Sequence, residues 1–115
     1  MQAIDLTKVK EFSSQQLVKK IVHDSELMRV VLLCFEDGQF IPPHNVPCDV
    51  CLYAMEGEGV VTAGDKQVPL KAGEMVVVPA GQDRGIKANG RYVVLHAVAP
   101  RPTPAMHAAA NPSKQ

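Results

Sequence analysis

Apolar residues along this chain come in short runs that alternate with turn residues, and the helical period is nearly absent from residue 17 to residue 100. The runs are rich in Val, Ile and Leu, and glycine occupies most of the turns between them. Turns recur about every 8 to 12 residues, which is typical of a β-sandwich or barrel. The chain is therefore predicted to be all-β. Its predicted strands cover residues 17–22, 28–35, 44–55, 60–63, 67–70, 74–81 and 91–100.

The pattern divides the chain into three parts built around a single domain. Residues 1–27 form an N-terminal arm and a first strand, residues 28–100 form the barrel, and residues 101–115 form a loose tail. The arm has no clean period and is expected to hold at most a short helical turn. The tail is rich in Pro and Ala, a composition that does not sustain a sheet. The pair Pro42-Pro43 lacks two backbone donors and is expected at a strand end or a sheet edge.

Charge and composition exclude several kinds of partner. The chain has 115 residues, with 12 basic and 12 acidic side chains. This balance leaves no surplus of cations for a phosphate backbone or an anionic membrane, so neither a nucleic acid nor a membrane is an expected partner. No apolar run approaches the ~20 residues that span a bilayer, and no signal sequence is visible, so the expected location is cytoplasmic. The three cysteines are expected to stay reduced.

Glycine, proline and histidine stand at a fixed spacing around the predicted turns. A glycine is followed after five residues by a histidine, and a second glycine closes that segment. Further along, a glycine, a proline and another glycine follow in the order G-x5-P-x-G. The glycines allow the positive φ angles that hairpin turns need. These residues are Gly38, His44 and Gly57 in the first segment and Gly73, Pro79 and Gly81 in the second.

This spacing resembles the two motifs of the cupin family, G-x5-H-x-H-x3/4-E-x6-G and G-x5-P-x-G-x2-H-x3-N, over roughly residues 28–100. The resemblance implies a small single-domain cupin, whose jelly-roll barrel is a double-stranded β-helix. In the family, three histidines and a carboxylate hold a metal ion inside the barrel. Here His44 alone keeps a ligand position. Val46 and Val50 replace the second histidine and the glutamate, and Arg84 replaces the third histidine.

Side chains alternate between the inside and the outside of a barrel along each strand. With His44 inside, the even-numbered residues that follow it also face the cavity, and its wall is then mostly apolar. A single imidazole cannot hold a divalent cation well, so no cofactor is expected. The candidate ligand-binding residues are His44, Val46, Val50, Leu52 and Arg84.

Arg84 strengthens the argument against a metal. A guanidinium ~4 Å from a cation costs about 4 kcal/mol per pair of unit charges at an effective dielectric constant near ~20. A buried arginine is itself expensive. Arg84 is therefore expected to reach solvent, to pair with an acid such as Asp49 or Asp83, or to meet an anionic ligand.

A second interpretation retains one divalent transition metal. His44, Cys48 and Cys51 form an H-x3-C-x2-C sequence. Cysteines of opposite parity on one strand do not suit a redox pair, and structural zinc needs a second pair of ligands. Under this interpretation His44 and Cys48 are atypical metal ligands, completed by another residue or by water. Cys34 is expected in the core.

The outer face of the barrel is predicted to carry a subunit interface. The resemblance implies a homodimer, since small single-domain cupins commonly dimerise. An outward strip of Cys51, Tyr53 and Met55, joined by Tyr92, fits a two-fold interface. Resemblance to other cupins also places His96, in the last strand, on the outer face.

Three functions from different classes remain open. The leading one is a metal-free module that binds a small, partly apolar and possibly anionic molecule inside the barrel. The second is a metal-dependent enzyme of the oxygenase or isomerase kind, built on His44 and Cys48. The third is a dimerising barrel with a filled core and a structural role. No Ser-His-Asp constellation or phosphate-binding glycine loop is visible, so the sequence supports no particular catalysis.

Overall fold

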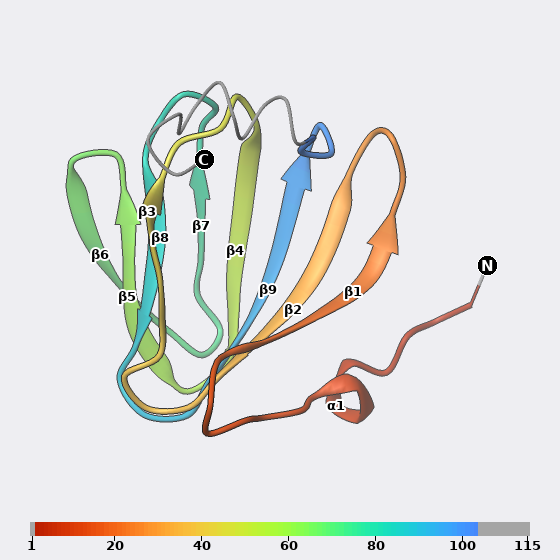
Figure 1. Cartoon of the computed structure of the whole chain (residues 1–115), viewed down its shortest axis with the longest axis vertical. Helices are drawn as coiled ribbons and strands as arrows, with labels where there is room; N and C mark the ends of the chain where they lie inside the picture. The colour runs from red at the N-terminus through yellow and green to blue at the C-terminus, as the bar shows by residue number, and fades with distance from the viewer. Residues whose placement is uncertain (1, 104–115) are drawn as a thin grey trace.

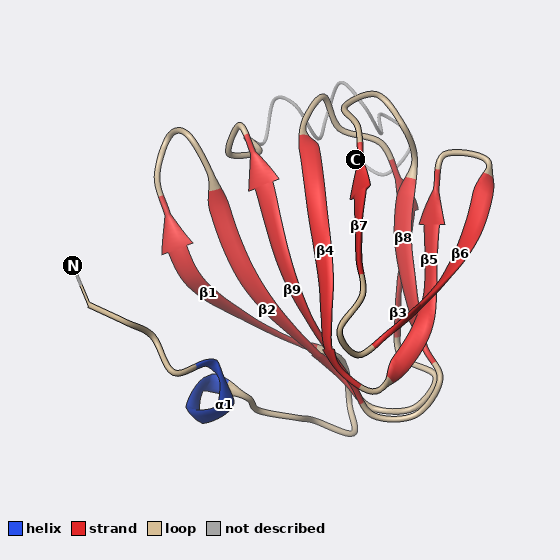
Figure 2. Ribbon diagram, turned by 180° about the vertical axis from the view of Figure 1, so that it is seen from behind, coloured by secondary structure: helices blue, strands red, loops and turns tan. Residues whose placement is uncertain are grey.

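The computed structural model describes residues 2–103, and these form almost only β-structure (Figure 2). The part of the predicted tail from residue 104 onward lies outside the described residues. One short helix precedes nine strands in the described part of the chain. In chain order the elements are α1 (Leu6–Val9), β1 (Val18–Asp24), β2 (Arg29–Phe35), β3 (Phe40–His44), β4 (Asp49–Glu56), β5 (Glu58–Ala63), β6 (Lys66–Lys71), β7 (Met75–Val78), β8 (Arg84–Ala88) and β9 (Tyr92–Ala99).

Two antiparallel sheets face each other and spread apart toward one end of the molecule, the open end (Figure 1). One sheet has the strand order β1-β2-β9-β4-β7, and the other has the order β3-β8-β5-β6. Strands far apart in the sequence are neighbours, as β2 and β9 are. The predicted all-β class and double-stranded β-helix are confirmed. Within residues 2–103, no helix has the length and apolar character needed to cross a bilayer.

One apolar core fills the space between the two sheets. Burial alternates along β4, where Val50, Leu52 and Ala54 are buried while Cys51 and Tyr53 lie on the other face. This alternation follows from strand geometry, because successive side chains point to opposite sides of the sheet. The inward and outward faces predicted for this segment are confirmed.

The proline pair and a motif glycine lie where the sequence predicts them. The pair Pro42-Pro43 lies in β3, an edge strand of its sheet, where a missing N–H donor costs the least. Gly57 joins β4 to β5 with a φ of +81°, and a Cβ at this position would collide with the carbonyl of Arg91. Only glycine fits there, so this motif residue is part of the scaffold.

β8 is a strand that the sequence pattern did not predict. It lies between β3 and β5 and pairs with both. The segment Arg84–Ala88 is short, begins with a charged residue and has turn residues on both sides. Its strand conformation comes from the neighbours on either side rather than from its own composition. The missed strand matters for function because it carries Arg84 opposite His44 of β3.

The N-terminal arm packs against the outer face of the five-stranded sheet, near the end where the sheets converge (Figure 1). The ring of Phe12 lies under the guanidinium of Arg91, 4.1 Å from ring centroid to Cζ, a cation–π contact. Cys34 is buried, but it lies in a second small core under the arm rather than inside the barrel. The buried residues of this second core are Leu32, Cys34 and Val93, and Val9, Phe12, Val18, Met55 and Leu95 pack against them.

The strip predicted for a subunit interface is partly wrong. Tyr92 is fully buried in the barrel core, where its hydroxyl donates a 2.7 Å hydrogen bond to the carbonyl of Leu70. Met55 is half-buried and packs on the second core. Tyr53 does remain outside, beside its cross-strand partner Met75 of β7, and both side chains are exposed.

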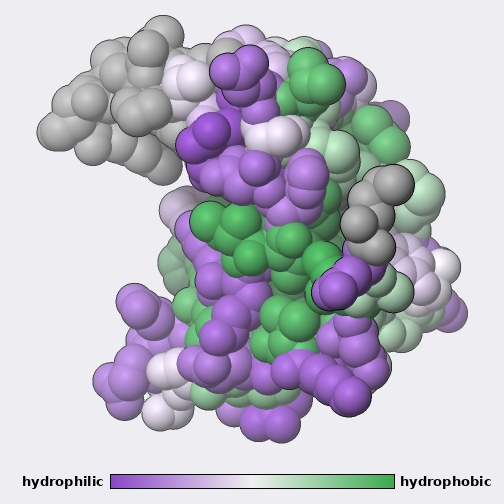
Figure 3. All heavy atoms as spheres, turned by 90° about the vertical axis from the view of Figure 1, so that its right-hand side faces the viewer, coloured by the Kyte–Doolittle hydropathy of each residue, from purple (hydrophilic) through white to green (hydrophobic). Residues whose placement is uncertain are grey.

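Apolar side chains also gather on the side of the molecule where β1 forms the edge of its sheet (Figure 3). Polar side chains surround them in this view. The exposed apolar residues of the β1–β2 hairpin are Ile21, Leu27 and Met28. The molecule therefore has apolar surface both on this hairpin and beside Tyr53.

Candidate functional site

His44 and Arg84 lie opposite each other on β3 and β8, where β3 ends and β8 begins at the open end of the barrel (Figure 1). β3 ends at His44 and β8 begins at Arg84, and the two residues are cross-strand partners. Cross-strand partners lie on the same face of a sheet, which here is the inner face. The Nδ1 of His44 lies 3.1 Å from the carbonyl oxygen of Pro42. Two candidate residues from different motifs thus meet in one site.

His96 belongs to the same site, although the sequence analysis placed it on the outer face. Its cross-strand partners in β2 and β4 are Val31 and Leu52, which both face the core. The inward series of β9 begins with Tyr92 and runs through every second residue, so it includes His96. Counting back from the strand-ending proline selected the wrong face. The alternation of large side chains that starts at Tyr92 is the signal that could have found it.

A cavity of about 160 Å³ opens beside these residues. A smaller chamber of about 20 Å³ lies next to them and is lined in part by Leu52. Ile41, His44, Arg84 and His96 line both spaces. The residues around the larger space are Lys19, Arg29, Val31, Leu33, Ile41, His44, Arg84, His96, Val98 and Pro102.

The charges around the cavity favour a negatively charged ligand. Arg84 is only 6% exposed, and its Nη1 donates to the carbonyl of Cys48 at 3.5 Å. Burial lowers the pKa of Arg84, although a guanidinium keeps its charge in proteins. Lys19 and Arg29 add positive charge, and the described residues that line the cavity include no carboxylate. The ion pair between Arg29 and Asp24, 3.3 Å from Nε to Oδ1, offsets part of this charge.

His96 contributes a neutral imidazole to the cavity. Burial lowers its pKa to about 4, and the positive charges of Arg84 and Lys19 act in the same direction. The ring is therefore uncharged at neutral pH. Its Nδ1 is buried, and no group in the described part of the chain forms a hydrogen bond with it.

The structure places the other candidate residues around this site. Val46 and Val50 lie in the buried core, and neither is among the residues that line the two spaces beside His44. The acids proposed as partners of Arg84 interact elsewhere. Asp49 accepts a 2.8 Å hydrogen bond from the backbone N–H of Ala80, and Asp83 accepts one from the side chain of Asn45. Within residues 2–103, neither acid forms an ion pair with Arg84.

The donor set does not fit a resident metal ion of the family type. His44 and His96 are the two imidazoles at the cavity, and a guanidinium lies at its wall with them. Cys48 lies in the core, where burial raises the pKa of its thiol and so disfavours the thiolate that binds metal. Among the described residues, no group of three or more His, Cys, Asp or Glu side chains is arranged to hold a metal.

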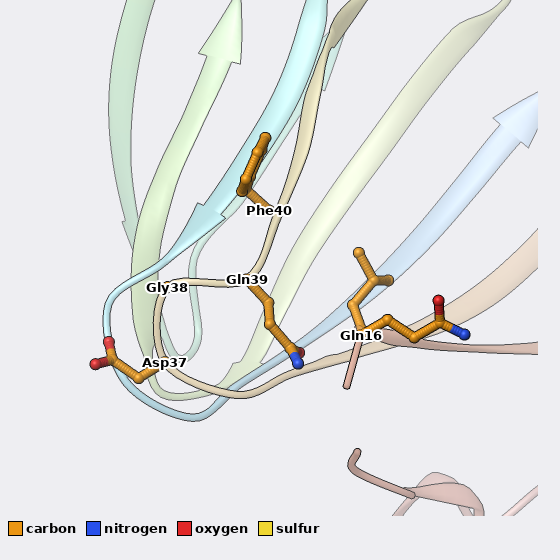
Figure 4. A pocket seen from close by; sticks show the side chains of 6 residues that line it. Gln16, Asp37, Gly38, Gln39 and Phe40 are labelled. Atoms are coloured by element: carbon orange, nitrogen blue, oxygen red, sulfur yellow. The ribbon is translucent and has the colours of Figure 1, made fainter. Parts of the chain in front are cut away.

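A larger recess of about 430 Å³ lies at the opposite end, where the β2–β3 turn meets the chain that follows the arm (Figure 4). Two of the polar side chains that line it, Asp37 and Gln39, form hydrogen bonds within the protein. Asp37 accepts a 2.7 Å hydrogen bond from the backbone of Gly90. Gln39 accepts from the backbone N–H of Glu36 and donates to the carbonyl of Ser13. The smaller cavity beside Arg84 is the better candidate because it contains a buried guanidinium and the buried Nδ1 of His96, which forms no hydrogen bond among the described residues.

Two facing antiparallel sheets with this connectivity, and a cavity at their open end, define the double-stranded β-helix class. A family model described as a cupin domain matches residues 31–98, which is more than half of the chain. The chain therefore belongs to the cupin family. A search of curated proteins found no match.

Solved structures agree with this assignment. The TT1209 protein of Thermus thermophilus is 30% identical, with a TM-score of 0.84 over 89% of this chain and 100% of that chain. An RmlC-like cupin of Desulfovibrio desulfuricans is also 30% identical, with a TM-score of 0.79 over 87% of this chain and 97% of the other. A cupin superfamily protein of Desulfitobacterium hafniense, 22% identical, shares the fold with a TM-score of 0.79, over 87% of this chain and 92% of its own.

Proposed function

We propose that this cupin is a binding module that takes a small anionic molecule into the cavity beside Arg84, without a metal ion. The observation that carries the proposal is a buried guanidinium at the wall of a cavity that no carboxylate lines, with no carboxylate partner for that guanidinium among the described residues. A buried charge without a counter-ion is costly, and an anionic ligand offsets that cost. The planar fork of an arginine also matches a carboxylate well.

The shape of the cavity supports a ligand with an apolar body. Val31, Leu33 and Val98 line the larger space together with the charged groups. Small-molecule sites commonly combine an apolar wall with a few polar groups that orient the ligand. A small organic acid satisfies both features, since its carboxylate pairs with Arg84 and its carbon chain contacts the aliphatic wall.

A thermal-shift screen of small organic acids tests the proposal. A carboxylate at 100 times its Kd stabilises the folded state by about 2.7 kcal/mol, which is a measurable rise in Tm. The neutral amide of each acid serves as the control, and we expect it to give no shift. A screen in which acids and amides behave alike contradicts the proposal and favours a structural role.

A metal-dependent enzyme is the alternative, and the observation in its favour is that two imidazoles line one cavity. Elemental analysis of protein purified without chelator separates the two functions. We expect well under one metal ion per chain. Stoichiometric iron, zinc, nickel or manganese would overturn the metal-free proposal.

A further inference from the structure

The cavity beside Arg84 consists of two adjoining spaces of very different size. The larger one holds about 160 Å³, while the smaller one, of about 20 Å³, has room for a single water-sized group. Ile41, His44, Arg84 and His96 line both spaces. A ligand whose charged group meets Arg84 therefore places its next atoms close to His96.

His96 presents a polar atom that the protein leaves without a partner. Its Nδ1 is buried and forms no hydrogen bond with another residue in the described part of the chain. Leaving a buried polar atom unpaired is costly, and a ligand that supplies the missing hydrogen bond recovers that cost. The ring is neutral at neutral pH because burial, together with nearby cations, lowers its pKa to about 4. A neutral imidazole suits an uncharged hydroxyl or oxo group better than a second carboxylate.

This inference rests on the proposed anion-binding function. We infer that the ligand is a small carboxylate with a hydroxyl or oxo group on the carbon next to the carboxylate that meets Arg84. The carboxylate pairs with Arg84, and the neighbouring hydroxyl or oxo group forms a hydrogen bond with the Nδ1 of His96. Arg84 and His96 line the same two spaces, so polar groups on adjacent carbons of one small ligand can meet both residues.

The size and charge of the larger space limit the rest of the ligand. A cavity of ~150 Å³ with apolar walls holds one benzene ring, so the ligand body contains only a few carbon atoms. The aliphatic side chains of Val31, Leu33 and Val98 provide apolar surface that contacts the carbon atoms of this body. Lys19 and Arg29 lie on the wall of the same space and attract an anion as it approaches.

Matched pairs of acids that differ by one hydroxyl group test the inference by isothermal titration calorimetry. The pairs are lactate with propionate and 2-hydroxyisovalerate with isovalerate. We expect the hydroxy acid to bind the full-length protein about tenfold more tightly than its partner, which corresponds to ~1.4 kcal/mol. Equal affinities within both pairs would overturn the inference while leaving the anion-binding function intact. No binding of any of the four acids would contradict the proposed function as well.

Two variants of His96 identify the group that recognises the hydroxyl. His96→Leu removes the hydrogen-bonding atom, and we expect the two acids of each pair to bind it equally. His96→Asn keeps a polar atom close to the position of Nδ1, and we expect it to retain part of the preference. A preference that persists in His96→Leu would overturn the assignment, because another group would then recognise the hydroxyl. If His96→Leu does not fold, as judged by circular dichroism, the titrations of the matched acid pairs with the unmodified protein still test whether the hydroxyl group is recognised.

Discussion

Arg84 lies on the inner face of β8 with almost all of its surface buried, beside two imidazoles and a wall of aliphatic side chains. Its Nη1 donates to one backbone carbonyl at 3.5 Å, the long limit of a hydrogen bond. This is a poor arrangement for stability, since desolvating a cation costs several kcal/mol and one weak acceptor returns little of it. A side chain held at such a cost is explained most simply by binding.

We therefore expect Arg84→Met to leave the free energy of unfolding unchanged or to raise it by about 2 kcal/mol, because replacing a buried charge with an apolar side chain is often stabilising. Urea unfolding at neutral pH measures the change. Lys66→Met replaces an exposed cation on β6 and serves as the control, with a change within ~0.5 kcal/mol. A loss of more than about 2 kcal/mol in Arg84→Met would show that the guanidinium is structural.

His96 makes stability depend on pH. Its pKa in the folded state is lowered to about 4 from an ordinary value near 6.5, mainly by burial. The contribution of neutral His96 to the free energy of unfolding is therefore complete above its unfolded-state pKa, and it is lost as the pH falls from ~6.5 toward 4. Between pH 7 and pH 4 we expect protonation of this one group to lower the free energy of unfolding by on the order of 3 kcal/mol.

Urea unfolding at pH 7, 5.5 and 4 checks this, with unmodified protein compared with His96→Asn. On acidification from pH 7 to pH 4, we expect the free energy of unfolding of the variant to fall by roughly 3 kcal/mol less than that of the unmodified protein. His23→Asn changes an exposed histidine of β1 and should follow the unmodified protein. If the free energy of unfolding changes with pH in the same way in all three proteins, then His96 is not buried as a neutral group.

At the scale of elements, the N-terminal arm acts as a cover for the outer face of the five-stranded sheet. Phe12 packs on the second core, and the backbone of Glu11 forms a hydrogen bond with the Cys34 thiol. Burial raises the pKa of that thiol more than this hydrogen bond lowers it. The arm therefore keeps Cys34 both covered and protonated.

We expect Phe12→Ala to speed alkylation of Cys34 by about tenfold or more, because loss of the ring lets the arm open locally. Mass spectrometry after iodoacetamide treatment measures the rate, in proteins that all carry Cys51→Ser to remove the half-exposed thiol. Cys48 inside the barrel is the internal control and should remain unlabelled. Phe40→Ala removes an exposed ring from β3 and should change nothing. Equal rates for Cys34 in all variants would show that the arm does not protect it.

Elements with their own strong pattern could be predicted from the sequence, and elements defined by their neighbours could not. The alternation along β4 and the motif glycines follow from local geometry, which is why the fold class, the family and the inward direction of Leu52 were predicted. β8 could not be predicted because it has little apolar character of its own. The inward direction of His96 could not be predicted because β9 is apolar on both faces, so its sequence does not show which face points to the core. The cavity that joins Arg84 to His96 depends on strand pairing, which no local pattern contains.

At the scale of the whole molecule, the outer face of β4 and β7 is exposed and apolar. Tyr53, Met75 and Val77 are 41%, 57% and 52% exposed and lie on neighbouring strands. Exposed apolar surface of this kind commonly marks a contact with another chain. A two-fold axis through this face would place the same residues of two copies against each other.

We expect the protein to sediment as a dimer and Met75→Glu to sediment as a monomer at the same concentration, because the two-fold axis brings the new carboxylates together. Analytical ultracentrifugation measures the mass. Phe40→Glu introduces the same charge on the outer face of the other sheet and should remain dimeric. A dimer that persists in Met75→Glu would move the interface elsewhere, with the β1–β2 hairpin as the next surface to test.

Binding of a carboxylate by metal-free protein tests the central claim most directly. Protein treated with chelator, and shown by elemental analysis to be free of metal, is titrated with 2-hydroxyisovalerate in a calorimeter. The account predicts saturable binding to the unmodified protein and none to Arg84→Met. Binding that appears only after a divalent metal is restored, or that is equally strong in Arg84→Met, would contradict it.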